Sequence, residues 1–164
     1  MAARVVAGAS GKLRAAPDDV WALLTDWAGV MRWWPANNSE TLVDDGYVLT
    51  EVKLDGGEAE IPRTRVISSK AGTSVTETLL HQDDDLRRIY YDLCDDGIPG
   101  IRNYRATTTL DAESDGWSRL TFHSTFDVLP DTDADLKRSQ IESVYKDAIL
   151  YGFSVCLKAE LAID

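Results

Sequence analysis

The pattern of hydrophobic and polar positions changes character three times along the chain of 164 residues. Residues 4–13 alternate and contain enough valine to predict a strand. Pro17, which needs no N–H partner in a first helical turn, then introduces a hydrophobic stripe at helical spacing. The stripe consists of Val20, Leu23, Leu24 and Trp27. A second short helix is expected over residues 30–34, ended by Pro35.

From residue 42 to residue 128 the pattern is that of strands. Short segments rich in β-branched residues are separated by polar turns such as Gly56-Gly57 and Asp115-Gly116. The strands are expected over residues 47–54, 63–68, 74–81, 87–93, 103–110 and 118–128. Because the turns between them are short, the segments should pair as hairpins in an antiparallel meander.

Beyond Pro130 the helical period returns. Asp133 can cap a helix that is expected to run to about Leu161. One face of this helix carries Ile141, Val144, Tyr145, Ala148, Gly152, Val155 and Ala159. Glycine inside a helix costs about 1 kcal/mol relative to alanine. Gly152 therefore indicates either close packing of the helix or space left for a ligand.

Together these elements predict one α+β domain over residues 1–164. Its order is strand, two short helices, six strands and a long C-terminal helix, which gives a seven-stranded curved antiparallel sheet around that helix. A sheet of this size twists and curls. Helix and sheet can then touch at both ends and stand apart in the middle, where an apolar small molecule could bind.

Composition restricts the partners. The hydrophobic content of 44% and charged content of 27% are ordinary for a globular protein, whereas the net charge of −11 disfavours nucleic acid and anionic membranes. No apolar run approaches the roughly 20 residues of a membrane span. The first eight residues are too mixed for a signal peptide, so a cytoplasmic location without membrane insertion is expected.

No metal or cofactor is expected. The aspartate clusters lack the spacing of a calcium loop and are typical of solvated turns. Cys94, Cys156, His81 and His123 have no metal-ligand spacing, and no phosphate-binding loop occurs. Alternation places His123 on the opposite face from Phe122, which favours a surface histidine.

The segment of residues 16–27, followed by Trp33-Trp34-Pro35, resembles the START-like helix-grip superfamily (SRPBCC). The similarity is to its bacterial polyketide cyclase/dehydrase and lipid-transport branch. Further similar segments are residues 64–67, 75–80, 83–88, 91–93 and 103–107. The resemblance implies a helix-grip fold with a cavity between the sheet and the C-terminal helix.

Candidate ligand-binding residues follow from this cavity and from the alternation of the strands. They are Trp33, Leu79, Ala106, Thr108, Phe122, Phe126, Ala148 and Gly152. Trp33 or Trp34 could form part of a lid over the cavity mouth. The expected function is binding of a hydrophobic small molecule: a lipid, polyketide or aromatic metabolite.

The alternative is a polyketide cyclase, aromatase or dehydratase that acts on a poly-β-keto substrate in the same cavity. The resemblance implies that Arg65, Tyr91 and Tyr104 could polarise a carbonyl and stabilise an enolate, with Glu77 as a base. If Arg65 and Glu77 point inward they should pair, and if they point outward the pair is of little consequence. The resemblance favours the inward arrangement. A nearby Arg65 would lower the pKa of Glu77, which opposes a role as base.

Overall fold

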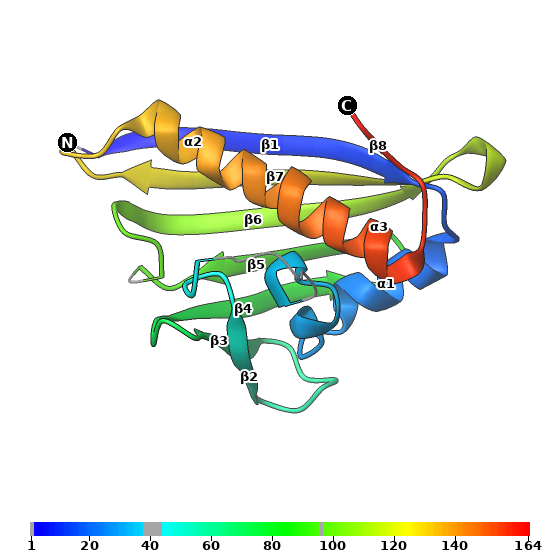
Figure 1. Cartoon of the computed structure of the whole chain (residues 1–164), viewed down its shortest axis with the longest axis horizontal. Coiled ribbons are helices and arrows are strands. Elements are labelled where there is room, and N and C mark those ends of the chain that lie inside the picture. The colour runs from blue at the N-terminus through cyan, green and yellow to red at the C-terminus, as the bar shows by residue number, and fades with distance from the viewer. Residues whose placement is uncertain (1, 38–43, 96) are drawn as a thin grey trace.

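The fold is an antiparallel sheet that wraps around a long C-terminal helix (Figure 1). The computed structural model describes residues 2–37, 44–95 and 97–164. In these residues, eight strands form one sheet in the order β2-β3-β4-β5-β6-β7-β1-β8. The strands are β1 (Ala3–Leu13), β2 (Leu49–Asp55), β3 (Arg63–Ser69), β4 (Ser74–Asp83), β5 (Arg88–Leu93), β6 (Ile101–Ala112), β7 (Ser118–Val128) and β8 (Leu161–Ile163).

Helical segments follow β1 and β7. The first group comprises α1 (Pro17–Thr25) and two 3₁₀ turns, η1 (Val30–Arg32) and η2 (Pro35–Asn37). A further 3₁₀ turn, η3 (Ser114–Gly116), links β6 to β7. The C-terminal helix is continuous over α2 (Ala134–Ser143), the π-helical segment η4 (Val144–Leu150) and α3 (Tyr151–Leu157). Asp133 caps its first turn by accepting a hydrogen bond from the backbone N–H of Leu136, as expected.

The α+β helix-grip class and the antiparallel meander are confirmed, with four corrections. The described sheet has eight strands rather than seven, because residues 161–163 pair with β1 as an edge strand. The C-terminal helix ends at Leu157 rather than near Leu161, since Lys158 takes a left-handed conformation with φ of 51° that ends the helix. Residues 47 and 48 precede β2, and Pro35 begins a second 3₁₀ turn instead of only ending the first.

The C-terminal helix covers one half of the sheet. It begins over β1 and ends beside α1 (Figure 1). Its buried side chains are Ile141, Tyr145, Leu150 and Phe153. Tyr145 stacks on Phe122 of β7 with ring centroids 4.9 Å apart. The core between the helix and strands β1, β6 and β7 is therefore filled by side chains.

Two buried arginines of β3 attach the end of α1 to the other half of the sheet. Arg63 donates a hydrogen bond to the carbonyl of Thr25 at 3.3 Å, and Arg65 donates one to the carbonyl of Trp27 at 3.1 Å. The Thr25 carbonyl lies at the helix C-terminus, where carbonyls lack partners inside the helix and carry partial negative charge, and the Trp27 carbonyl lies two residues beyond it. The guanidinium groups supply both the donors and the opposite charge.

A bulge in β6 determines where Tyr104 points. Asn103 has a φ of 53°, and the pairing of β6 with β7 shifts between Arg102 and Arg105. As a result Ile101 and Tyr104, three residues apart, are both buried, whereas a regular strand would place them on opposite faces.

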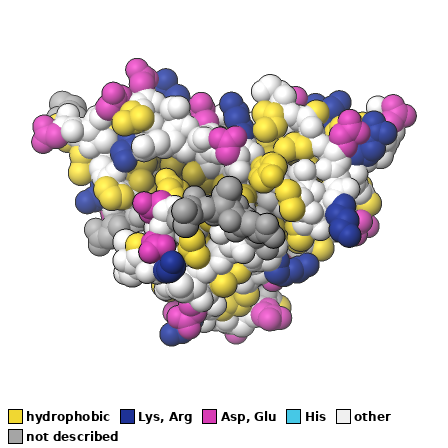
Figure 2. All heavy atoms as spheres, in the orientation of Figure 1, with side chains coloured by type: hydrophobic (Ala, Val, Ile, Leu, Met, Phe, Trp, Pro, Cys, Tyr) yellow, Lys and Arg dark blue, Asp and Glu magenta, His cyan; other side chains and the backbone are white. Residues whose placement is uncertain are grey.

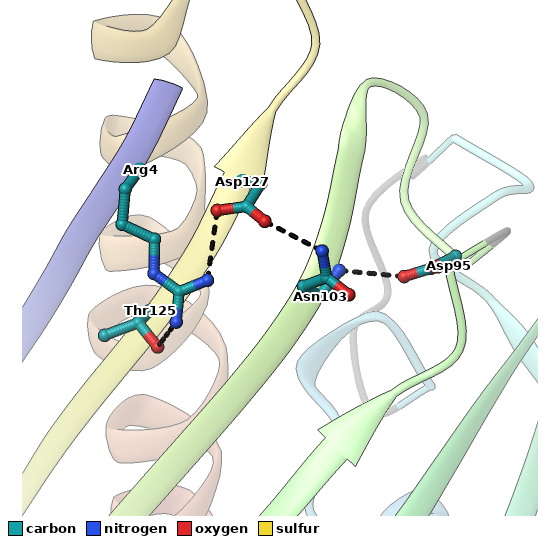
Figure 3. Close-up of polar contacts among 5 residues, drawn as sticks. All are labelled: Arg4, Asp95, Asn103, Thr125 and Asp127. Carbon is teal, nitrogen blue, oxygen red and sulfur yellow. Dashed lines mark hydrogen bonds and ion pairs between the residues drawn. The ribbon is translucent and has the colours of Figure 1, made fainter. Parts of the chain in front are cut away.

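A polar network on the outer face holds this bulge (Figure 3). The backbone N–H of Asn103 donates to the carboxylate of Asp95 at 2.8 Å, and its side-chain amide donates to Asp127 at 2.7 Å. Arg4 binds the other oxygen of Asp127 at 3.0 Å and also donates to Thr125. Arg4 and Asn103 lower the pKa of Asp127, chiefly through the hydrogen bond from Asn103.

Substitution of Asn103 should separate the backbone contribution from the side-chain contribution. Asn103→Gly loses only the hydrogen bond to Asp127, whereas Asn103→Ala also bears the strain of a left-handed conformation, about 1–2 kcal/mol. Asn103→Ala should therefore unfold at the lower urea concentration. Equal midpoints for the two variants would contradict this account of the bulge.

Candidate functional site

An open cleft of about 1480 Å³ runs between the C-terminal helix and the strand half that the helix leaves uncovered. Figure 2 shows hydrophobic side chains gathered in the middle of this face, with charged side chains around them. The helix contributes mainly Ile141, Val144, Ala148, Tyr151, Gly152 and Val155. The opposite wall and floor are formed mainly by Trp33, Trp34, Tyr47, Val75, Ile98 and Ile101.

The π-helical segment η4 forms the centre of the helix wall. It places Tyr145 in the core, 1% exposed, while its neighbours Val144 and Ala148 line the cleft. Single π-helical turns within α-helices are frequent at functional sites. Here the segment supplies an aromatic core contact and an apolar cleft wall within seven residues.

Gly152 marks a close contact between the helix and the η1–η2 segment. A Cβ atom on this residue would lie 2.1 Å from the carbonyl oxygen of Trp33. The ring of Trp33 packs edge-on against Phe153, with centroids 4.9 Å apart. The sequence left open whether Gly152 allows close packing or leaves space for a ligand. The structure shows close packing, and Gly152 also borders the cleft. Trp33 acts as a fixed wall of the cleft.

A pair of buried phenols lies next to the floor. Val75 and Ile101 line the cleft, and the next inward residues on their strands are Glu77 and Tyr104. The hydroxyls of Tyr104 and Tyr145 are 2.5 Å apart and share a hydrogen bond. The hydroxyl of Ser124 lies near both phenols but makes no hydrogen bond of good geometry.

The three phenols below the floor, those of Tyr91, Tyr104 and Tyr145, are held in the neutral form. Burial raises the pKa of Tyr91 and of Tyr104 well above the usual value, and the neighbouring tyrosines add to the effect. Burial also raises the pKa of Tyr145. Neutral phenols can donate a hydrogen bond to a carbonyl or enolate oxygen. They are unsuited to act as bases near neutral pH.

Arg65 and Glu77 point inward and form a buried pair, as the resemblance implied. Their side chains are 11% and 15% exposed, and Arg65 Nε donates to Glu77 Oε2 at 2.6 Å. A second guanidinium nitrogen also contacts Glu77, and the third donates to the Trp27 carbonyl. The ring of Trp27 covers the guanidinium at 3.7 Å. Arg65 thus joins β3, β4 and the end of α1, and each of its nitrogens is engaged.

The structure divides the expected ligand-binding residues into two groups. Trp33, Ala148 and Gly152 line the cleft. The others are at most 4% exposed and are packed in the core: Leu79, Ala106, Thr108, Phe122 and Phe126. The four residues considered for catalysis, Arg65, Glu77, Tyr91 and Tyr104, lie together below the floor. The ring centroids of Tyr104 and Tyr91 are 6.4 Å apart, and the ring of Tyr91 packs against that of Trp27.

The cleft also contains residues that the sequence analysis did not select. Tyr47, Tyr151 and Val155 are large hydrophobic residues that are 58%, 51% and 51% exposed at its rim. Val155 was placed on the buried face of the helix, and Tyr47 was expected in a strand. A signal was present in Tyr151, which lies seven residues after Val144 and four before Val155 and so makes the apolar surface of the helix wider than the expected face.

In the described residues, no group of three or more histidine, cysteine, aspartate or glutamate side chains could hold a metal ion. His81 and His123 are both exposed, and the expected surface position of His123 is thereby confirmed. No helix in the described part of the chain has the length and apolar character needed to cross a membrane.

The sequence matches the polyketide cyclase / dehydrase and lipid transport family over residues 9–150. This match covers most of the chain, and the protein therefore belongs to that family. No curated protein sequence matches the chain.

Solved structures agree on the fold. An uncharacterised protein from Bacillus thuringiensis superposes with a TM-score of 0.71 at 18% identity, over 94% of this chain and 99% of the other. A protein from Thermobifida fusca gives 0.63 at 26% identity, over 93% and 87%. Norcoclaurine synthase from Thalictrum flavum, solved in complex with dopamine and hydroxybenzaldehyde, gives 0.71 at 13% identity, over 96% and 88%.

The raised phenol pKa values predict a specific alkaline behaviour. In the folded protein Tyr104 should stay protonated at pH 10, where an unfolded tyrosine is about half ionised. The folded state therefore holds its proton more tightly, and the stability from this group is lost as pH rises above about 10.

Difference titration at 295 nm between the wild type and Tyr104→Phe checks this point. Below pH 10 the folded proteins should show the same phenolate absorbance, and the wild type should exceed the variant only after unfolding in denaturant. A phenolate transition near pH 10 that the folded variant lacks would show that Tyr104 is accessible to solvent.

Proposed function

We propose that the protein binds a hydrophobic small molecule, such as a lipid, polyketide or aromatic metabolite, in the cleft beside the C-terminal helix. The observation that carries this proposal is the open volume of about 1480 Å³, whose rim exposes Tyr47, Tyr151 and Val155. Apolar side chains gathered around a concavity are the usual signature of a ligand site. Leaving them in water would be unfavourable by about 25 cal/mol per Å² of apolar surface.

The comparisons support the same class of ligand. The family description includes lipid transport. The plant enzyme with the same fold was solved with two small aromatic molecules bound. A cavity bordered by Trp33 and Trp34 would offer such molecules flat apolar surfaces to contact.

Filling the cleft should abolish binding while preserving the fold. Ala148 is half-buried in the centre of the helix wall, so Ala148→Trp would place an indole in the space for the ligand. The neutral dye N-phenyl-1-naphthylamine should fluoresce with the wild type and lose at least tenfold in affinity with this variant.

The matched control is Val6→Trp, because Val6 is exposed on β1 and does not line the cleft. Its dye affinity should equal that of the wild type. If both variants bind the dye like the wild type, with circular dichroism unchanged, the cleft is not the binding site.

A second candidate function is that of a polyketide cyclase, aromatase or dehydratase. The buried phenol pair of Tyr104 and Tyr145 favours it, because neutral donors in a water-poor site could stabilise an enolate oxygen. Arg65 and Glu77 would then act mainly by positioning, since the guanidinium is occupied by Glu77 and Trp27. The family description, which includes cyclases and dehydrases, supports this candidate as well.

Tyr104→Phe tests the enzymatic candidate with little change in packing volume. Under this candidate, a poly-β-keto thioester should give an altered product distribution and slower turnover with the variant, while dye binding persists. Tyr90→Phe is the control, because Tyr90 is exposed on the neighbouring strand β5. Identical products from wild type and Tyr104→Phe would remove Tyr104 from any catalytic role.

A further inference from the structure

Few charged side chains line the cleft, and they differ in the contacts that they make. Among the described lining residues, Arg32, Lys137 and Asp147 carry formal charge. Arg32 forms an ion pair with Asp26 at 2.9 Å, and Asp147 accepts a hydrogen bond from Ser143. Lys137 has no ion-pair partner within the described residues.

What distinguishes Lys137 is its place in the cleft. It makes neither an ion pair nor a side-chain hydrogen bond in the described residues, whereas Arg32 and Asp147 each make such a contact. Lys137 is half-buried and lines the cleft one helical turn before Ile141. A partly desolvated ammonium beside apolar side chains gains free energy when an anion joins it.

Lys137 stands at one end of a long apolar wall. Along the helix, the 15 residues from Lys137 to Gly152 span about 22 Å at 1.5 Å per residue. Ile141, Val144 and Ala148 line the cleft between these two positions.

We propose that the ligand is an elongated amphipathic anion. Its acidic head group binds the ammonium of Lys137, and its apolar body lies along the helix wall toward Trp33. This inference rests on the proposed ligand-binding function and adds the chemical class and the orientation of the ligand. Asp147 is exposed to solvent at the edge of the cleft, whereas Lys137 is half-buried, so Lys137 is the lining charge that gains more from an oppositely charged head group.

Two amphiphiles of equal chain length test this assignment. Dodecanoate and dodecanol differ in the charge of the head group and can each displace N-phenyl-1-naphthylamine from the cleft. Lys137→Met should lower the ratio of dodecanoate affinity to dodecanol affinity about fivefold, the size expected of a partly exposed ion pair. The preference for dodecanoate in the wild type should also weaken as sodium chloride is raised.

Lys146→Met is the charge-matched control, because Lys146 lies on the same helix and does not line the cleft. Its affinity ratio should match that of the wild type. An unchanged ratio in Lys137→Met, or an equal fall in both variants, would overturn the inference and leave the apolar site intact. Failure of the neutral dye and both amphiphiles to bind the wild type would instead overturn the proposed function, and the inference with it.

Discussion

The mismatch in width between one helix and a large sheet determines this structure. Eight strands about 4.8 Å apart span roughly 34 Å, whereas a helix with its side chains is about 10 Å wide. The C-terminal helix therefore covers only the half around β1, β7 and β6. Arg63 and Arg65 attach the end of α1 to the other half through the carbonyls of Thr25 and Trp27. The cleft lies between the C-terminal helix and the η1–η2 segment that follows α1, and Gly152 allows the helix to approach the Trp33 carbonyl closely.

The polar groups beneath the cleft are arranged to be neutral or paired. Tyr104 and Tyr145 satisfy each other, and Arg65 is shared between Glu77 and Trp27. Breaking a buried ion pair by removing one partner typically costs about 3–5 kcal/mol, so this layer resists rearrangement. A rigid, satisfied floor leaves recognition to the shape of the apolar walls and to the charges at the ends of the cleft.

The sequence predicted the order of the strands and the faces of β6 and β7, because alternation and short turns report directly on them. It could not locate the end of the helix, since Ala159 and Leu161 continue the apolar period while Lys158 turns the backbone left-handed. The bulge at Asn103 leaves no mark in the hydrophobic pattern, yet it orients Tyr104. Nor does alternation show which inward side chains are tightly packed: Leu79 and Phe126 fill the core, whereas Val75, on the same face of β4 as Leu79, lines the cleft.

Methyl NMR during titration with the neutral dye tests the central claim that the ligand space lies beside the core and not within it. The account predicts that the largest shift changes occur at methyl groups of the cleft walls, namely Val75, Ile98, Ile141 and Val144. Methyl groups of Leu79 and Leu120, which are fully buried in the core, should remain unchanged. Larger changes at Leu79 and Leu120 than at the cleft walls would contradict it, because the ligand would then enter the packed core.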